Sequence, residues 1–273
     1  MRHPRAILES HGLRPKRSLG QNFLFDENIL GKIVDAASVT ESDTVLEIGA
    51  GLGHLTMLLG ERAGKVIALE LDEKLLPVLE SVLGLYPNVR VIHADVLEGG
   101  WAEQVEAGQY KVVANVPYYI TGAILRHFLE HEKKPSLMVL TVQKEVAERL
   151  AAEPGDMSLL AASVRYYGQV ENVETIKAGS FWPRPDVDSA IIRIDMANSR
   201  EWGIADEQFF RVVQMGFAQK RKQLQKNLRG LGLSKQELDA AFRAANIEGR
   251  RRAQSLSVAE WVGLVKALPF SGT

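Results

Sequence analysis

The chain has 273 residues, of which 46% are hydrophobic and 25% charged, with a formal net charge of −1. This balance is typical of a globular protein with room for one large domain and a small one. The absence of cysteine excludes a disulfide framework, a thiolate metal site and a cysteine nucleophile. No signal-peptide pattern and no membrane-spanning apolar run is found, so we expect a cytoplasmic protein with no membrane partner and no metal site.

The charged residues are unevenly distributed along the chain. Residues 1–20 carry five Lys or Arg against one acid, residues 211–252 carry eleven against three, and residues 21–210 carry sixteen against twenty-nine. Basic segments on either side of an acidic body favour a polyanionic partner. Two solvated basic helix faces would give the same counts, so charge alone leaves both interpretations open.

Five apolar runs in the first half of the chain predict strands. They are residues 44–51, 65–72, 89–95, 110–117 and 136–143. Stretches with helical spacing lie between them, and strands that alternate with helices are typical of βαβ units. The pattern predicts a doubly wound α/β fold with a mostly parallel, Rossmann-like sheet.

The pattern changes after these runs. A helix is predicted around 158–167, and the alternating segments 171–179 and 188–196 predict an antiparallel pair of strands. A boundary is predicted near 197–206, and one continuous helix over 207–228.

Two domains follow from this change of pattern. We expect a catalytic domain over residues 1–196 and a small, basic, all-helical domain over residues 197–273. The stretch 219–229 of the second domain is predicted to bind the phosphates of a nucleic acid. Its basic residues are Lys220, Arg221, Lys222, Lys226 and Arg229. On a continuous helix, three of these (Lys222, Lys226 and Arg229) would share one face.

The first predicted strand ends in the glycine-rich turn EIGAGLGHLT, residues 47–56. Gly49, Gly51 and Gly53 let the backbone turn tightly and approach a ligand. The Gly-Lys-Ser/Thr pattern of a phosphate loop is absent, which disfavours a nucleoside triphosphatase. A strand–helix turn without a ligand would use the same glycines, but the context favours a nucleotide-like ligand, with Gly49 and Gly51 in its site.

Carboxylates end the next two predicted strands. Glu70 follows Gly49 by 21 residues, where a carboxylate can accept both hydroxyls of a ribose. Asp95 ends the third strand and could accept the amino group of an adenine. Each acid alone is typical of a solvated turn, but three such features at successive strand ends indicate a nucleoside-containing cofactor.

The fourth predicted strand ends in NVPYYIT, residues 115–121, and this turn decides between NAD and S-adenosylmethionine. Hydride transfer needs a proton donor, whereas Asn115, the carbonyl before Pro117 and the ring of Tyr118 offer two acceptors and a stacking face. Two acceptors can draw an aromatic amine toward tetrahedral geometry and free its lone pair to attack a sulfonium methyl. The turn therefore predicts methyl transfer to a planar amine, with alignment rather than a tuned base as the main catalytic factor.

Together, these motifs resemble the ribosomal small-subunit RNA adenine dimethyltransferase (KsgA-type) family over nearly the whole chain. Besides the strand-end motifs, the similar segments are KRSLGQNFL (16–24), VQKEVAERL (142–150), SFWPRPDVDSA (180–190), GFAQKRKQLQKNL (216–228) and RRAQSL (251–256). Single motifs occur in many methyltransferases, but the ordered set is specific.

The resemblance implies S-adenosylmethionine as the cofactor and N6,N6-dimethylation of two adjacent adenosines in 16S rRNA during ribosome biogenesis. The partner would be the small ribosomal subunit, and the protein a monomer. The implied cofactor-binding residues are Asn22, Leu24, Gly49, Glu70, Asp95 and Asn115. The target base would be held by the turn of Asn115, Pro117 and Tyr118, with Phe181 on the opposite side of the base from Tyr118.

Two positions depart from the pattern of that family. The residue after Tyr118 is usually asparagine there and is Tyr119 here, which bears on the size of the pocket and on the second methylation. Gln254 stands where glutamate is expected, and we interpret it as a structural position. Three other functions compete with this interpretation: a large-subunit rRNA adenine methyltransferase of the antibiotic-resistance type, a noncatalytic nucleic-acid-binding factor on the same fold, and a dehydrogenase.

Overall fold

The computed structural model describes residues 1–107, 109–196 and 201–270. Its strands are β1 (Phe23–Leu24), β2 (Thr44–Ile48), β3 (Lys65–Glu70), β4 (Val89–His93), β5 (Tyr110–Asn115), β6 (Leu137–Gln143), β7 (Gln169–Ile176), β8 (Phe181–Trp182) and β9 (Ser189–Asp195). Its α-helices are α1 (Pro4–Ser10), α2 (Glu27–Ala36), α3 (His54–Gly60), α4 (Leu76–Leu83), α5 (Thr121–Glu130), α6 (Lys144–Ala151), α7 (Leu159–Tyr167), α8 (Asp206–Phe217), α9 (Leu224–Asn227), α10 (Lys235–Ala244) and α11 (Val258–Ala267). In this described part of the chain, no helix has the length and apolarity needed to cross a membrane.

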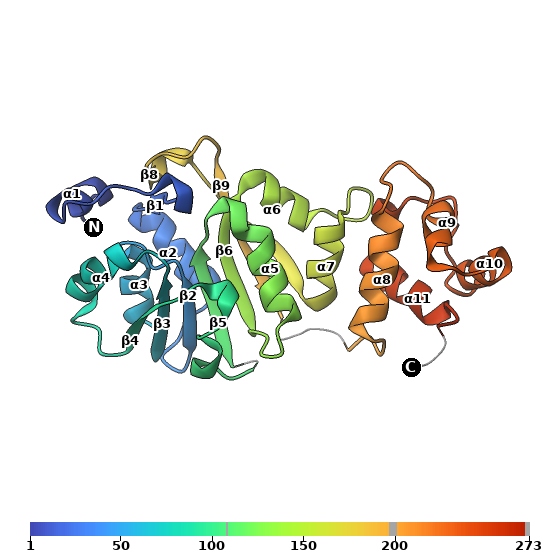
Figure 1. Cartoon of the computed structure of the whole chain (residues 1–273), viewed down its shortest axis with the longest axis horizontal. Helices are drawn as coiled ribbons and strands as arrows, with labels where there is room; N and C mark the ends of the chain where they lie inside the picture. The colour runs from blue at the N-terminus through green and yellow to red at the C-terminus, as the bar shows by residue number, and fades with distance from the viewer. Residues whose placement is uncertain (108, 197–200, 271–273) are drawn as a thin grey trace. The chain divides into compact units, whose positions relative to one another are not determined.

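Seven strands form one sheet in the order β4-β3-β2-β5-β6-β9-β7, with helices on both faces (Figure 1). Among them, β9 alone runs antiparallel to its neighbours β6 and β7, and the other pairs are parallel. The doubly wound, mostly parallel sheet predicted from the sequence is thereby confirmed. The strand order reverses between β2 and β5, and in folds of this kind ligands bind at the carboxyl ends of the strands beside such a reversal.

Apolar packing on the two faces of the sheet fixes these strands. On one face, buried residues of α2 and α3 such as Ile33 and Leu59 pack in one cluster with Val113 of β5. Successive side chains of a strand point to opposite faces, so Tyr110 of β5 lies on the other face. There it joins Trp101 and Phe128 of α5, and the rings of Trp101 and Phe128 are 5.0 Å apart. The central strands are therefore buried on both sides, which explains their continuous apolar runs.

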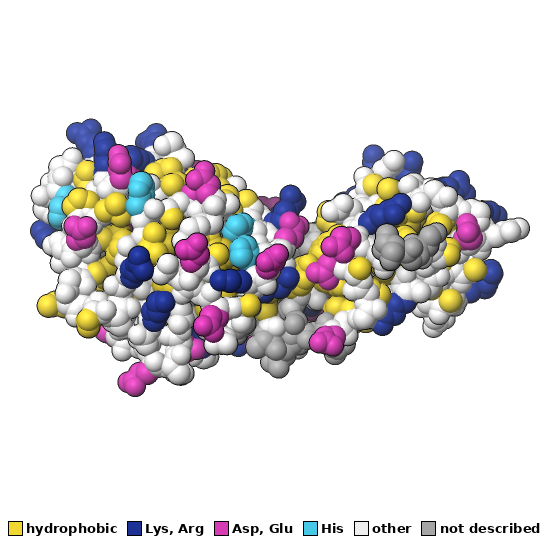
Figure 2. Space-filling view, turned by 60° about the horizontal axis from the view of Figure 1, so that its bottom comes forward, with side chains coloured by type: hydrophobic (Ala, Val, Ile, Leu, Met, Phe, Trp, Pro, Cys, Tyr) yellow, Lys and Arg dark blue, Asp and Glu magenta, His cyan; other side chains and the backbone are white. Residues whose placement is uncertain are grey.

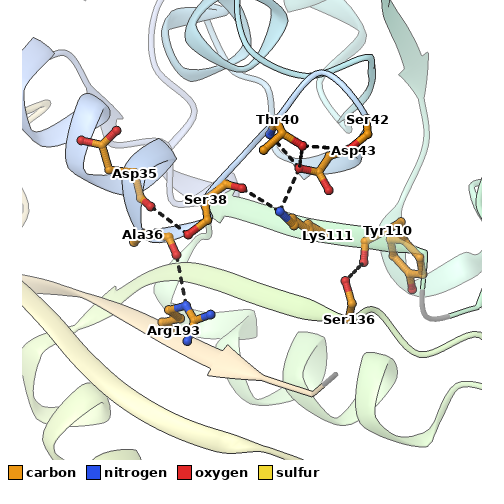
Figure 3. Close-up of polar contacts among 10 residues, drawn as sticks. All are labelled: Asp35, Ala36, Ser38, Thr40, Ser42, Asp43, Tyr110, Lys111, Ser136 and Arg193. Carbon is orange, nitrogen blue, oxygen red and sulfur yellow. Dashed lines mark hydrogen bonds and ion pairs between the residues drawn. The ribbon is translucent and has the colours of Figure 1, made fainter. Parts of the chain in front are cut away.

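Polar side chains tie down the amino-terminal edge of the sheet (Figure 3). At the start of β5, Lys111 Nζ lies 2.8 Å from Asp43 Oδ2 and donates to the main-chain oxygen of Ser38 at 2.8 Å. Arg193 of β9 donates to the main-chain oxygen of Ala36 at 3.2 Å. These contacts attach the connection between α2 and β2 to the sheet, at the edge opposite the carboxyl ends of the parallel strands.

The described chain divides into two compact units. One comprises residues 1–147 and 169–196, and the other comprises residues 148–168 and 201–270. The boundary predicted at residue 197 falls in 197–200, outside the described residues. The division differs from the predicted one in the segment 148–168, which a single cut in the chain would have left in the first unit.

Aromatic packing explains why α7 belongs to the second unit. Tyr166 of α7 stacks on Phe209 of α8 with ring centroids 3.9 Å apart, and its hydroxyl donates to Asp206 at 2.9 Å. Tyr167 donates to the same carboxylate at 2.7 Å. These contacts join segments about forty residues apart in sequence, so the helical pattern of α7 alone could not assign it to either domain.

The continuous helix predicted over residues 207–228 is wrong. α8 ends at Phe217 and α9 begins at Leu224. At Gly216, α8 passes the ring of Trp261 so closely that a Cβ atom would lie 2.3 Å from it. The chain can pack this tightly only with glycine at that point, and it leaves the helix directly afterwards.

Asn227 stabilises the break between the two helices. Its side-chain nitrogen donates to the main-chain oxygen of Gly216, in the last turn of α8, and to that of Gln219, in the segment between α8 and α9. Lys222 therefore lies before the start of α9. It does not share a helical face with Lys226 and Arg229, although all three side chains are exposed.

Candidate cofactor and nucleobase site

A cavity opens at the carboxyl ends of β2, β3, β4 and β5, beside the reversal of strand order. The N-terminal segment 19–23 and the aromatic residue that opens β8 complete its wall. The structure brings nine of the predicted site residues together in this wall. They are Asn22, Gly49, Gly51, Glu70, Asp95, Asn115, Pro117, Tyr118 and Phe181. The side chain of Leu24 is buried in the core instead, and it lines a smaller neighbouring cavity.

The glycine turn after β2 and the carboxylate of Glu70 form one unit. Gly49 and Gly51 have φ of 75° and 59°, which glycine adopts without strain. A Cβ on Gly49 would meet no atom within 4 Å, so its backbone is open toward the cavity. The main-chain N–H groups of Gly51 and Asp72 each donate to one oxygen of Glu70, both at 2.8 Å.

Glu70 is 6% exposed, and this burial raises the pKa of its carboxyl above the usual value. The two backbone N–H groups favour the charged form and limit the rise. A carboxylate has about four acceptor positions, so both oxygens can accept further hydrogen bonds from the cavity. Ribose hydroxyls suit these remaining positions, and the open glycine backbone leaves room beside them. The residues present therefore fit a nucleoside such as that of S-adenosylmethionine.

Asp72, two residues after the end of β3, anchors the N-terminal segment. Its carboxylate, 3% exposed, lies 2.6 Å from Lys16 Nζ and accepts from Gln21 Nε2 at 3.0 Å. Burial alone would raise the pKa of Asp72, but the bonds from Lys16 and Gln21 outweigh it and hold that pKa below its usual value. This network fixes residues 19–23 along the cavity. The analysis of the sequence missed it, because its partners lie more than fifty residues apart.

Asn115 ends β5 with its amide held in one orientation. Its Nδ2 donates to the main-chain oxygen of Asn22 at 3.1 Å, and Asn22 in turn donates to the main-chain oxygen of Gly20 at 3.1 Å. With its nitrogen bound to a carbonyl, the amide keeps its oxygen as the acceptor available to a ligand. That oxygen is the group predicted to bind the target amine.

Tyr118 is the aromatic residue of the same turn. Its hydroxyl lies 2.6 Å from the hydroxyl of Ser189, which is fully buried at the start of β9. Burial raises the pKa of Tyr118, so the side chain remains a neutral phenol. Phe181 lines the same cavity from β8, which pairs with β1 through Leu24. Its place opposite the target base stays a prediction.

Asp95 follows β4 and begins a 3-10 turn, residues Val96–Glu98. One oxygen of its half-buried carboxylate accepts the main-chain N–H of Leu97 at 2.9 Å. The carboxylate lines the cavity one strand beyond Glu70. Its role as the acceptor for an adenine amino group stays a prediction.

Glu47 is a buried acid that the sequence analysis did not assign. It lies in β2 beneath the glycine turn, and its Oε2 has no hydrogen-bond partner. Burial raises the pKa of Glu47 to about 8, and the nearby charge of Glu70 adds to the rise. Glu47 is therefore mostly protonated and neutral at pH 7. Glu47 and Glu70 do not place two negative charges beside the glycine turn. An acid within the apolar run 44–48 was the signal that could have revealed it.

The two departures from the family pattern have different surroundings. Tyr119 is 62% exposed at the rim of the cavity, so its ring does not fill the pocket. Gln254 donates to the main-chain oxygen of Gly155 at 2.9 Å, and its own main-chain oxygen accepts from Gly155 and Met157. Gln254 thus holds the loop after α6, in agreement with a structural position.

The second unit carries an exposed basic surface. On the face seen in Figure 2, Lys and Arg side chains predominate over this unit, whereas Asp and Glu side chains are more frequent over the first. All five predicted RNA-binding residues are exposed. Main-chain bonds from Leu224 and Gln225 to residues 251 and 249 bring exposed Arg250 and Arg252 beside them. Arg250 and Arg252 therefore extend the basic surface formed by residues 219–229.

Comparison with known proteins agrees with the family resemblance of the sequence motifs. Residues 12–269 match the sequence profile of the family described as ribosomal RNA adenine dimethylase. A relative from Dehalococcoides mccartyi named ribosomal RNA small subunit methyltransferase A is 47% identical over 266 residues, which are 96% of this chain and 91% of the relative. A relative of the same name from Geobacillus thermodenitrificans is 44% identical, over 96% of this chain and 94% of the relative.

Two solved structures resemble the whole fold. The 23S rRNA methyltransferase ErmE has a TM-score of 0.74 at 27% identity, over 90% of this chain and 99% of that one. A dimethyladenosine transferase from Plasmodium falciparum has a TM-score of 0.75 at 25% identity, over 89% and 95%.

Proposed function

The chain belongs to the ribosomal RNA adenine dimethylase family, and we propose that it methylates N6 of two adjacent adenosines of small-subunit rRNA, twice each. The observation that carries this proposal is the strand-end turn of Asn115, Pro117 and Tyr118, in which the amide nitrogen of Asn115 is occupied by Asn22. Relatives at 47% and 44% identity, both named for the small subunit, support that substrate.

The cofactor, S-adenosylmethionine, supplies an electrophilic methyl group on a sulfonium. Glu70 would accept hydrogen bonds from its ribose, Asp95 would accept one from its adenine, and Gly49 and Gly51 would leave the backbone uncovered beside it. The backbone of Asn22 would close the cavity from the N-terminal segment. These roles follow from the burial of Glu70 and from the open glycine backbone.

The target adenine would bind through its amino group. The side-chain oxygen of Asn115 and the main-chain oxygen of Val116 accept its two N–H groups, which turns the nitrogen lone pair toward the methyl group. Tyr118 stacks on the base, and such stacking contributes roughly 1–3 kcal/mol. The raised pKa of Tyr118 keeps its hydroxyl protonated, so it is not a base. Alignment can supply about 7–11 kcal/mol of the barrier reduction.

Methyl transfer to ribosomal subunits tests this proposal. Small and large subunits from cells that lack the protein are incubated with labelled S-adenosylmethionine and the purified chain. We expect label in the small subunit, recovered as N6,N6-dimethyladenosine, and none with Asn115→Ala.

A large-subunit activity is the second candidate, favoured by the likeness to ErmE over 90% of this chain. Label in the large subunit alone would establish it. Label in neither subunit would favour a noncatalytic RNA-binding factor on the same fold.

We further propose that the protein acts as a cytoplasmic monomer. The small-subunit rRNA proposed as its substrate supports this location. Light scattering of the purified chain tests the monomer, and cell fractionation tests whether it follows small-subunit precursors.

A further inference from the structure

The two consecutive tyrosines of the strand-end turn, Tyr118 and Tyr119, have different surroundings. Tyr118 is half-buried and fixed by Ser189, whereas Tyr119 is 62% exposed at the rim of the same cavity. A phenol ring exposed to this extent leaves a flat apolar surface in water and stabilises the fold little. The ring of Tyr119 therefore lies exposed at the entrance of the cavity and takes little part in the hydrophobic core.

Gly20 supports this ring from the side of the protein. Gly20 has φ of 61°, and a Cβ atom there would lie 3.2 Å from Cε1 of Tyr119 and 3.3 Å from Cβ of Pro117. Without a side chain at residue 20, the backbone lies directly against the ring. The ring thus has one supported side and an open side toward solvent.

Positive charge lies on the segment that supports the ring. Gly20 ends a short 3-10 helix, Arg17–Leu19, and the side chains of Arg17 and Arg14 are exposed. An open aromatic face with arginines on the adjoining segment suits a nucleotide, because the ring can stack on a base while a guanidinium contacts its phosphate.

We propose that Tyr119 is a positioning residue that stacks on the nucleotide next to the adenosine held in the cavity. This inference rests on the function proposed above, in which that neighbour is the second target adenosine. Tyr119 holds the neighbour outside the pocket while the first base reacts. An asparagine at this position would have no ring and would offer no such surface.

The test combines substitutions of Tyr119 with changes of the two adenosines in the RNA. Small subunits from cells lacking the protein are prepared with both adenosines, or with one of the two changed to uridine. Binding affinity and methyl-transfer kinetics are measured for the natural chain, Tyr119→Ala and Tyr119→Phe. With both adenosines present, Tyr119→Ala should weaken affinity and raise KM about five-fold or more. Its kcat and its affinity for S-adenosylmethionine should change far less, and Tyr119→Phe should restore KM.

With a uridine neighbour, the smaller base stacks less well, so the loss caused by Tyr119→Ala should shrink. An equal loss on both particles, no loss on the adenosine pair, or failure of Tyr119→Phe to restore KM would overturn the inference. Affinity is measured without turnover, so it decides the role of Tyr119 even if the natural chain transfers no methyl group. That last result would instead contradict the proposed function.

Discussion

The side-chain nitrogen of Asn115 donates to the main-chain oxygen of Asn22, 3.1 Å away and 93 residues earlier in the chain. This bond joins the N-terminal segment, which lines the cavity, to the turn that we propose holds the target base. The segment is also fixed at Asp72 by Lys16 and Gln21. The N-terminal segment and the strand-end turn are therefore held on the same side of the cavity by hydrogen bonds.

Two substitutions of Asn115 distinguish its hydrogen bond to Asn22 from its proposed hydrogen bond to the target amine. Asn115→Ala removes the acceptor for the amine, and we expect no measurable turnover with an intact fold. Asn115→Asp keeps an acceptor but places a carboxylate against the carbonyl of Asn22, so we expect a lower rate and weaker cofactor binding. Single-turnover methylation of small subunits measures the rate. Thermal unfolding without and with S-adenosylmethionine measures the stability of the fold and the binding of the cofactor. A near-normal rate for Asn115→Ala would refute the role of this amide.

Replacement of Glu70 tests the cofactor site. Glu70→Ala should weaken S-adenosylmethionine binding by about 1.5–3 kcal/mol, the usual contribution of a hydrogen bond to a charged group. Glu70→Gln keeps one oxygen and should lose less. Glu73→Ala, at an exposed position three residues later, is the matched control and should bind normally. Calorimetry gives all four affinities, and an unchanged affinity for Glu70→Ala would remove Glu70 from the site.

The buried acid Glu47 predicts a pH dependence of stability. Its pKa is about 8 in the folded chain against an ordinary value of 4.5, so the folded protein keeps a proton that the unfolded chain releases. This contribution is fully present below pH 4.5 and is lost as the pH rises through 8. Between about pH 6 and pH 9, the free energy of unfolding should fall by roughly 2–3 kcal/mol.

Glu47→Gln should lack this part of the decline, because an amide does not ionise. Urea unfolding at the two pH values measures the difference, with exposed Glu41→Gln as the matched control. If the natural chain and Glu47→Gln declined equally, Glu47 would have to ionise in the folded protein near its ordinary pKa.

The basic surface of the second unit predicts a salt dependence of RNA binding. Lys222, before α9, Lys226, within it, and Arg229, after its end, are all exposed. Each phosphate contact contributes about 0.7–0.9 to the slope of log affinity against log salt concentration. The triple reversal to Glu should weaken RNA binding and flatten the slope by about 2–3, with unchanged affinity for S-adenosylmethionine. A preserved slope would mean that these residues are only solvated surface.

The sheet and the strand ends could be predicted because their signals are local. Three local signals are visible in the sequence: apolar runs of strand length, helical spacing between them, and a glycine turn after Ile48 with polar residues after Leu69 and Ala114. In a parallel sheet the carboxyl ends of neighbouring strands meet at one edge. The convergence of Gly49 and Asn115 therefore required no further information.

The remaining features depend on contacts between distant parts of the chain. Local helical spacing continues through Gly216, but Trp261 and Asn227 end α8 there. Ser189, which fixes Tyr118, lies 71 residues beyond it. No periodic pattern reports such partners, and only the packed chain reveals them.

Mass spectrometry of 16S rRNA from cells with and without this protein tests the central claim most directly. The account predicts two adjacent N6,N6-dimethyladenosines when the natural chain is present. It predicts unmethylated adenosines at both positions when the chain is absent or replaced by Asn115→Ala. Identical 16S rRNA in all three cultures, or a change confined to 23S rRNA, would contradict it.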